Sequence, residues 1–201
     1  MPRSVALGVA SMAALTLTLL PTAPAQAAVV STGACDSATL TQPFARWGDA
    51  NLYKLLTHGD FEGVLTGWSF TGGAQQTAGS EPFGVTGAVG ASALALPAGA
   101  SAQSPFTCVN ASYPTFRFLA RSAATASSVV AAVVYKTPIG TLTVPIGTAA
   151  LSSSWQPTAP MLTGALIAGV LSGGTAQVAL KFTATSGASR IDDIEIDPRM
   201  R

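Results

Sequence analysis

Several stretches of this 201-residue chain alternate apolar and polar side chains with a period of two residues. In residues 115–121, Phe116 and Phe118 fall on one face, and the residues between them fall on the other. Residues 177–185 and 190–197 show the same alternation. Such a pattern is typical of β-strands that bury one face. It therefore predicts a sheet structure and argues against an all-helical fold.

Clusters of small, turn-forming residues separate these stretches. They lie at residues 72–73, 79–84, 97–101, 137–140 and 172–174. Short strands joined by such turns predict an all-β chain folded as an antiparallel β-sandwich of jelly-roll type. Two apolar stretches also fit a helix: residues 121–133, and residues 159–173, which we expect to form a strand pair or a short helical turn.

The first 27 residues have the pattern of a secretory signal peptide. Arg3 supplies the basic start, residues 5–20 supply an apolar run, and Ala25-Gln26-Ala27 supplies a small-x-small cleavage site. The apolar run is too short and too rich in Ser and Thr for a membrane span. No later segment is long and apolar enough to cross a bilayer, so we expect cleavage after Ala27 and release of a secreted, extracellular chain.

The remaining length suits one domain with its own core. We expect residues 28–50 to form an N-terminal arm and residues 51–198 to form the β-sandwich domain. Cys35 and Cys108 are expected to form a disulfide that ties the arm down, because cysteine pairs of exported proteins usually oxidise. Two free thiols are the alternative.

Charged residues are few and nearly balanced. Ten Lys and Arg stand against nine Asp and Glu, which gives a net charge of +1. A chain with this balance lacks the basic surface that binds nucleic acid or anionic lipid. All the acidic residues except Glu81 lie towards the two ends of the mature chain, at residues 36–62 and 192–197.

The order of three motifs resembles a known family. Residues 59–70 read GDFEGVLTGWSF, residues 114–121 read PTFRFLAR, and residues 189–198 read SRIDDIEIDP. This order resembles the galactose-binding-like jelly rolls, notably carbohydrate-binding modules of families four and nine, and looks closest to small secreted actinobacterial proteins of that shape. The resemblance covers roughly residues 50–198. It implies a binding domain, although this fold carries many kinds of binding.

The resemblance also implies a structural calcium site. In that family, an opening motif of the N-G-D-F-E type and a closing motif of the I-D-D-V type commonly supply the ligands. The matching positions here are Asp60, Glu62, Asp192 and Asp193. This chain has Thr57 and His58 where the family often has an asparagine, so the opening motif is incomplete.

Simple alternation places Asp192 on the same face as Ile194 and Ile196. A carboxylate on an apolar face is costly unless it is paired or coordinated. Two interpretations remain open: a carboxylate that binds calcium, or one that is satisfied by hydrogen bonds or by Arg190 at the mouth of the sandwich.

Sugar binding requires aromatic rings that stand exposed on the surface. Trp68 and Trp155 are expected in the core, and Trp47 is expected to pack as a staple. The remaining candidates are Tyr135, Tyr113 and Phe83.

Three basic residues project away from the apolar faces of their strands: Arg117, Arg121 and Lys181. If the two strands are neighbours, these residues form a basic patch on one sheet that could meet sugar hydroxyls or acidic glycans. An ordinary solvated face is the alternative.

The sequence offers little for catalysis. His58 is the only histidine, the chain has no G-x-S-x-G elbow, and the acids are already assigned to structure or metal. We therefore expect a secreted, non-catalytic domain that recognises a glycan or another cell-surface polymer. The alternatives are a structural or protein-interaction role in the cell envelope or on the spore surface, and a hydrolase that uses His58.

Overall fold

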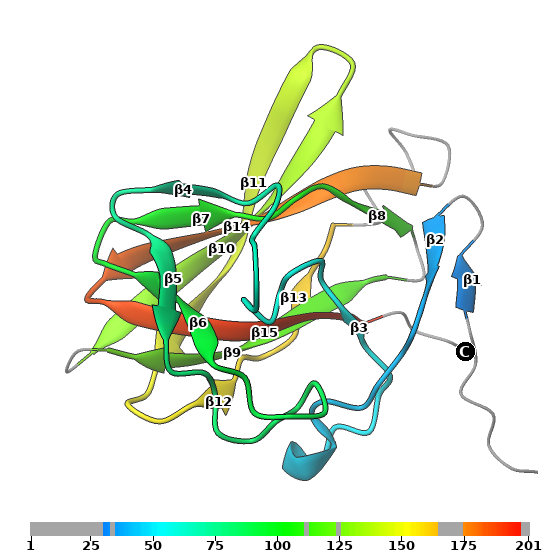
Figure 1. The fold of residues 1–201 in the computed structure, drawn as a ribbon. Helices are drawn as coiled ribbons and strands as arrows, with labels where there is room; N and C mark the ends of the chain where they lie inside the picture. Colours follow the sequence, from blue (N-terminus) through cyan, green and yellow to red (C-terminus); the bar gives the residue numbers. More distant parts are fainter. Residues whose placement is uncertain (1–29, 33–34, 111–112, 124–125, 165–174, 198–201) are drawn as a thin grey trace, which may run out of the picture.

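The computed structural model describes residues 30–32, 35–110, 113–123, 126–164 and 175–197 (Figure 1). These residues form two large antiparallel sheets that pack face to face, together with a small two-stranded sheet at the N-terminal end. The one helical turn among them is the 3₁₀ turn η1 (Ala45–Trp47). The predicted all-β sandwich is thereby confirmed.

The six-stranded sheet has the order β11-β10-β14-β7-β4, and β8 also pairs with β14. Its strands are β4 (Ser69–Thr71), β7 (Ser101–Gln103), β8 (Thr107–Asn110), β10 (Ser127–Thr137), β11 (Gly140–Leu151) and β14 (Thr175–Ser186). The ends of β10 and β11 project beyond the rest of the sheet as a hairpin (Figure 1).

The seven-stranded sheet has the order β12-β9-β15-β6-β5, with β13 paired to β9 and β3 paired to β15. Its strands are β3 (Lys54–Leu55), β5 (Gln75–Ala78), β6 (Ser92–Leu96), β9 (Thr115–Ser122), β12 (Gln156–Pro157), β13 (Met161–Leu162) and β15 (Ser189–Asp197).

Along the chain, single strands and pairs of consecutive strands alternate between the two sheets. Strand β3, near the start of the domain, pairs with the last strand, β15. This winding makes the sandwich a jelly roll. Residues 127–133, from the first stretch that also fits a helix, belong to strand β10. In the second stretch, Met161–Leu162 form β13, whereas residues 165–173 lie outside the described residues.

The core lies between the two sheets and follows the predicted alternation. Phe116 and Phe118 of β9 meet Phe182 of β14 across the interface, and the rings of Phe118 and Phe182 lie edge to face with centroids 5.0 Å apart. Trp68 is also buried in this core, against Phe61. The aromatic residues of three distant segments therefore join the two layers.

The N-terminal arm runs over the outside of the sandwich. Strands β1 (Val30–Thr32) and β2 (Cys35–Ala38) lie beside β8, where the predicted Cys35–Cys108 disulfide is formed. The chain then passes to the outer face of the seven-stranded sheet (Figure 1). There, a second buried cluster forms from Phe44, Tyr53, Ala93, Leu119 and Trp155, with Trp47 and Phe83 packed against it. The predicted signal peptide, residues 1–27, lies outside the described residues.

Candidate functional site: an acidic cluster and an aromatic sheet face

A bulge in β15 changes the face on which its acids lie. The register of β15 against β9 shifts between Asp192 and Glu195, and Asp193 adopts a φ of 43°. Such a bulge places two successive residues opposite one and reverses the alternation beyond it. As a result, Ile191 and Ile194 both point into the core.

The expectation that Asp192 shares the apolar face of Ile194 and Ile196 is therefore wrong. Asp192 lies on the outer face of the seven-stranded sheet and is nevertheless fully buried. Its carboxylate accepts hydrogen bonds from the Ser80 hydroxyl at 2.7 Å and from the backbone N–H of Glu81 at 2.9 Å. Burial still raises the pKa of Asp192 to about 7.

Arg190 does not assist Asp192. Its guanidinium donates to the backbone carbonyl oxygen of Ala78, at 2.8 Å. Asp192 is therefore satisfied by the loop that begins at Ser80, as the hydrogen-bonded interpretation predicted, but without an arginine.

The segment that contains the opening motif turns tightly against the bulge. The Ile194 N–H donates to the Gly59 carbonyl at 3.0 Å, and the Leu56 N–H donates to the Ile194 carbonyl at 2.9 Å. His58 and Phe61 both have positive φ, at 52° and 53°, which closes the turn. This turn brings the carboxylate of Asp60 to the acids of β15.

The result is a cluster of three carboxylates, which we call the acidic cluster: Asp60, Asp193 and Glu195. Burial, followed by the nearby Asp60 carboxylate, raises the pKa of Glu195 to about 8. Burial raises the pKa of Asp193 to about 9, with further contributions from the nearby carboxylates, including those of Asp192, Glu195 and Asp60. These groups repel one another in an environment that disfavours charge.

Glu195 is the most constrained member of the acidic cluster. Its side chain is 0% exposed, and neither carboxylate oxygen has a hydrogen-bond partner among the described residues. A buried, unpartnered carboxylate is costly unless it is protonated or binds a cation. Sequence analysis missed Glu195. Alternation with Ile194 and Ile196 puts this residue on the outer face, but it does not show that the position is buried beside Asp60.

The four predicted calcium ligands are not all brought together. Asp60 and Asp193 belong to the acidic cluster, whereas Glu62 is turned towards β6. The Glu62 carboxylate accepts the backbone N–H groups of Ala91 and Ser92, at 2.7 and 2.8 Å. Within the described ranges, no three Asp, Glu, His or Cys side chains direct their donor atoms at one point. The oxygen donors suit calcium, but their side chains must rotate to share an ion.

Two of the three predicted aromatic platforms are buried. Tyr113 is 1% exposed and Tyr135 is 2% exposed, since both rings point into the core. Neither presents a ring face to a ligand, which corrects the expectation. Phe83 is half-buried on the outer side of the seven-stranded sheet, where it packs edge to face against Trp47 and lies under the guanidinium of Arg46.

The predicted basic patch does not form, because β9 and β14 belong to different sheets. Arg117 forms an ion pair with Asp49 of the N-terminal arm. Arg121 lies over the Trp155 ring, 5.5 Å from its centroid. Lys181 projects from the outer face of the opposite, six-stranded sheet. Local alternation predicts the face of a strand correctly, but it does not show which sheet the strand joins.

An aromatic residue that the sequence analysis did not select lies on the outer face of the six-stranded sheet. Phe106, just before β8, is 37% exposed. The Lys136 ammonium of β10 lies 5.9 Å from the centroid of its ring. Because β8 and β10 flank β14 on opposite sides, the two side chains meet over β14. Tyr135 points into the core, so its neighbour Lys136 points outwards.

A hollow of about 220 Å³ adjoins this pair and is lined by Lys136, Thr175, Ala176 and Gln177. Gln177 lies opposite Cys108 in the pairing of β14 with β8, so the disulfide lies next to the hollow. We call Phe106, Lys136, Gln177 and Lys181 the sheet face. It combines a partly exposed ring with amide and ammonium donors.

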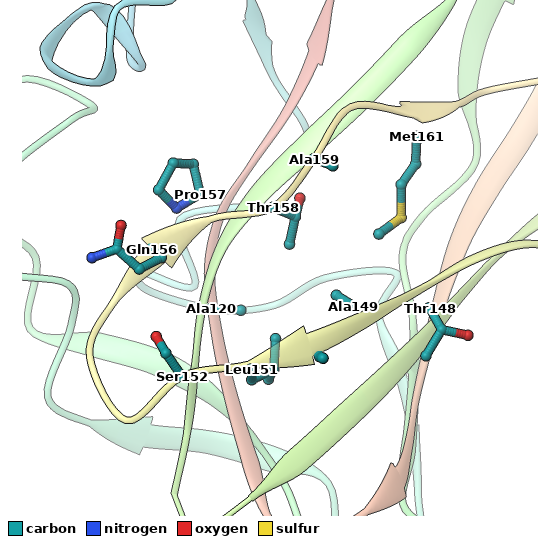
Figure 2. Close-up of a pocket in the computed structure, with 11 residues that line it drawn as sticks. Ala120, Thr148, Ala149, Leu151, Ser152, Gln156, Pro157, Thr158, Ala159 and Met161 are labelled. Atoms are coloured by element: carbon teal, nitrogen blue, oxygen red, sulfur yellow. The ribbon is translucent and has the colours of Figure 1, made fainter.

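A second, uncharged groove opens at the edge of the sandwich (Figure 2). It has a volume of about 370 Å³ and lies between the end of β11 and the β12–β13 segment, with Ala120 of β9 in its wall. Leu151, Met161 and several alanines line it, together with the polar side chains of Thr158 and Gln156. It holds no aromatic ring and no charge.

The structure provides no catalytic partners for His58. Its imidazole makes no hydrogen bond or ion pair with any residue in the part of the chain that is described. A hydrolytic triad needs the base held between an acid and a nucleophile, and these contacts are missing. None of the described residues forms a helix long and apolar enough to span a membrane.

Comparison with known proteins finds similarity of three-dimensional structure. No protein-family model matches the sequence, and no curated protein matches it. A family 11 carbohydrate-binding module of Clostridium thermocellum, in complex with a β-1,3-1,4-mixed-linked tetrasaccharide, aligns at a TM-score of 0.48 and 16% identity, over 74% of this chain and 97% of that one.

Two further solved structures are similar. A Clostridium thermocellum xylanase 10B fragment with family 22 and glycoside hydrolase 10 modules, complexed with xylohexaose, aligns at TM-score 0.45 and 16% identity, over 71% of this chain and only 28% of that one. A family 6 module of a Zobellia galactanivorans laminarinase aligns at TM-score 0.43 and 12% identity, over 64% and 90% of the two chains. These neighbours are carbohydrate-binding modules of families 22, 11 and 6, so families four and nine remain a prediction.

Proposed function

We propose that this protein is a secreted, non-catalytic domain that binds a glycan or another cell-surface polymer through the sheet face. The observation that carries this proposal is the Phe106 ring, which is partly exposed above β14 with the Lys136 ammonium over it, 5.9 Å from its centroid. Sugar rings present C–H faces that pack on aromatic rings and hydroxyls that need polar partners. Phe106 provides the first kind of contact, and Lys136 and Gln177 provide the second.

Small side chains of β10 and β14 form the outer face between Phe106, Lys136 and Lys181. Ala132, Val134 and Ala179 project from the same outer face but are almost fully buried. Because these three side chains are already covered, a ligand would contact the larger side chains around them. The adjoining hollow offers Thr175 and Gln177 for hydrogen bonds to sugar hydroxyls.

We further propose that the acidic cluster binds a structural calcium ion. Asp60, Asp193 and Glu195 would be its carboxylate ligands, whereas Glu62 is already engaged by two backbone N–H groups. The unpartnered oxygens of Glu195 support this assignment. Such an ion would link the turn at Gly59 to the last strand, β15, and so stabilise the sandwich.

A glycan array tests the binding proposal. The protein is expected to bind a subset of glycans, and Phe106→Ala is expected to lose that binding. Leu162→Ala serves as the matched control, because Leu162 is an exposed apolar residue on the other sheet. Binding that survives Phe106→Ala unchanged would move the site elsewhere, with the uncharged groove as the next candidate.

One observation favours the alternative of a structural or protein-interaction role. Ile139, at the tip of the β10–β11 hairpin, is 98% exposed, and Leu142 beside it is 47% exposed. Exposed aliphatic side chains on a projecting hairpin suit contact with another protein. Equal, weak signals for every glycan on the array would support this role over sugar recognition.

A further inference from the structure

Charge is distributed unequally between the two sheets. The six strands of the six-stranded sheet contain no Asp or Glu, and their charged residues are Lys136 and Lys181 alone. Both lysines project from the outer face, because Tyr135 and Leu180 beside them point into the core. The sheet face therefore carries positive charge only.

The acids gather on the opposite side of the molecule. Four belong to β15, and four more contact the seven-stranded sheet. Asp49 forms an ion pair with Arg117 of β9, and Asp60 lies near Glu195 of β15. Glu62 accepts the backbone N–H of Ser92 of β6, and the backbone N–H of Glu81 donates to Asp192 of β15. The ninth, Asp36, belongs to β2. The same side also carries five basic residues, so its charges are mixed, whereas the sheet face carries positive charge only. These residues are Arg46, Lys54, Arg117, Arg121 and Arg190.

Neither lysine is neutralised within the described residues. The one ion pair found there joins Arg117 to Asp49, on the other sheet. Lys136 contacts the Phe106 ring, and Lys181 lies opposite Ala132 on β10. An unpaired ammonium on a protein surface attracts anions of the surrounding solution, most strongly where several lie on one face.

The two lysines are spaced for a chain-like ligand. Continuing the register of β10 with β14 puts Lys136 beside Gln177, which also lines its hollow. Lys181 lies four residues further along β14, or about 13 Å at the usual rise of a strand. Phe106 and the small side chains of Val134 and Ala179 occupy the interval. A few linked sugar rings would span this distance.

We infer that the glycan bound by the sheet face is anionic, a polymer whose carboxylate or sulfate groups meet Lys136 and Lys181 while one ring packs on Phe106. This inference rests on the proposed function and adds the chemical class of the ligand. Neutral glycans would gain the aromatic contact but leave both ammonium groups unpaired. Anionic glycans gain both kinds of contact.

The experiment measures binding of the whole secreted chain to a polyuronate, a sulfated glycan and a neutral β-glucan of similar length, at low and at high ionic strength. The expected result is tighter binding to an anionic glycan, weakened by salt. Lys136→Gln and Lys181→Gln should each weaken that binding about two- to five-fold, the range of exposed ion pairs, and the double variant should weaken it further. The two anionic glycans distinguish carboxylate from sulfate as the preferred group.

Lys54→Gln is the matched control, because it removes the same charge from β3 of the other sheet and should leave binding unchanged. Equal affinity of the double lysine variant and the unaltered protein for every anionic glycan would overturn the inference. So would salt-independent preference for the neutral glucan, although the proposed function would then stand. Failure to bind any glycan would instead remove the proposed function itself.

Discussion

Asp60 and Glu195 place two carboxylates side by side, although they come from opposite ends of the sandwich domain. Burial and the neighbouring Asp60 charge raise the pKa of Glu195 to about 8, and its oxygens have no partner among the described residues. The jelly-roll winding creates this pair, because the turn at Gly59 is hydrogen-bonded to Ile194.

Calcium is expected to raise the melting temperature of the protein, and a chelator is expected to lower it. Glu195→Gln should abolish the calcium-dependent shift, because it removes a carboxylate from the acidic cluster. Glu62→Gln should preserve the shift, since that side chain caps the start of β6 instead. Thermal unfolding with excess chelator or excess calcium measures both. Identical melting curves under the two conditions would exclude a structural calcium ion.

Stability of the calcium-free protein is expected to fall as the pH rises. The pKa values of Asp192, Glu195 and Asp193 are raised to about 7, 8 and 9, so the folded state holds more protons than the unfolded state above about pH 4. The free energy of unfolding therefore decreases between about pH 4 and pH 9. Denaturant unfolding in chelator at several pH values checks this trend, and a rise in stability over that interval would contradict it.

Calcium should oppose this trend. The ion competes with protons for the same carboxylates, so its stabilising effect grows as they lose their protons. The difference between unfolding free energies with and without calcium is therefore expected to be small near pH 4 and largest near pH 9. A difference that stays constant with pH would point to an ion bound elsewhere.

Replacing Phe106 by alanine is expected to weaken glycan binding about five-fold or more, because an aromatic contact contributes about 1 kcal/mol beyond its buried area. Phe106→Trp should retain binding, since a larger aromatic ring still offers a face on which a sugar ring can pack. Titration calorimetry with the best glycan from the array measures both changes. Far-ultraviolet circular dichroism of each variant serves as the control for folding.

Loss of the disulfide is expected to destabilise the protein. The bond joins residues that are 73 apart in sequence. Closing a loop of this length reduces the entropy of the unfolded chain by an amount worth about 4 kcal/mol at room temperature. Chemical unfolding of a variant with Cys35→Ser and Cys108→Ser measures the loss. A variant as stable as the parent chain would show that the N-terminal arm is held by Phe44 and Tyr53 alone.

The fold could be predicted because its signal is local. Alternation along β9 and β14 shows which side chains are buried, and Phe116, Phe118 and Phe182 meet in the core as expected. Alternation does not show which strands share a sheet. The basic patch depended on β9 and β14 being neighbours, and Arg117 and Lys181 instead lie on opposite outer faces.

The candidate sites were harder to predict, because they depend on irregular backbone. One inserted residue, Asp193, turns Asp192 and Glu195 to the same outer face. Phe106 lies between two short strands, where no alternation marks its direction. Tyr135 was misplaced for a different reason: it alternates in phase with Val133, and that apolar neighbour already indicated the core.

The position of Lys136 and Lys181 on one outer face also determines how the molecule would lie on a large polymer. Both lysines lie on one outer face without an ion-pair partner among the described residues, so an anionic matrix would bind the molecule by that broad side. Adsorbed molecules would then share a single orientation. The arm that carries Arg46 and Trp47 covers the seven-stranded sheet, so it would face away from the matrix and form the outer surface of such a layer.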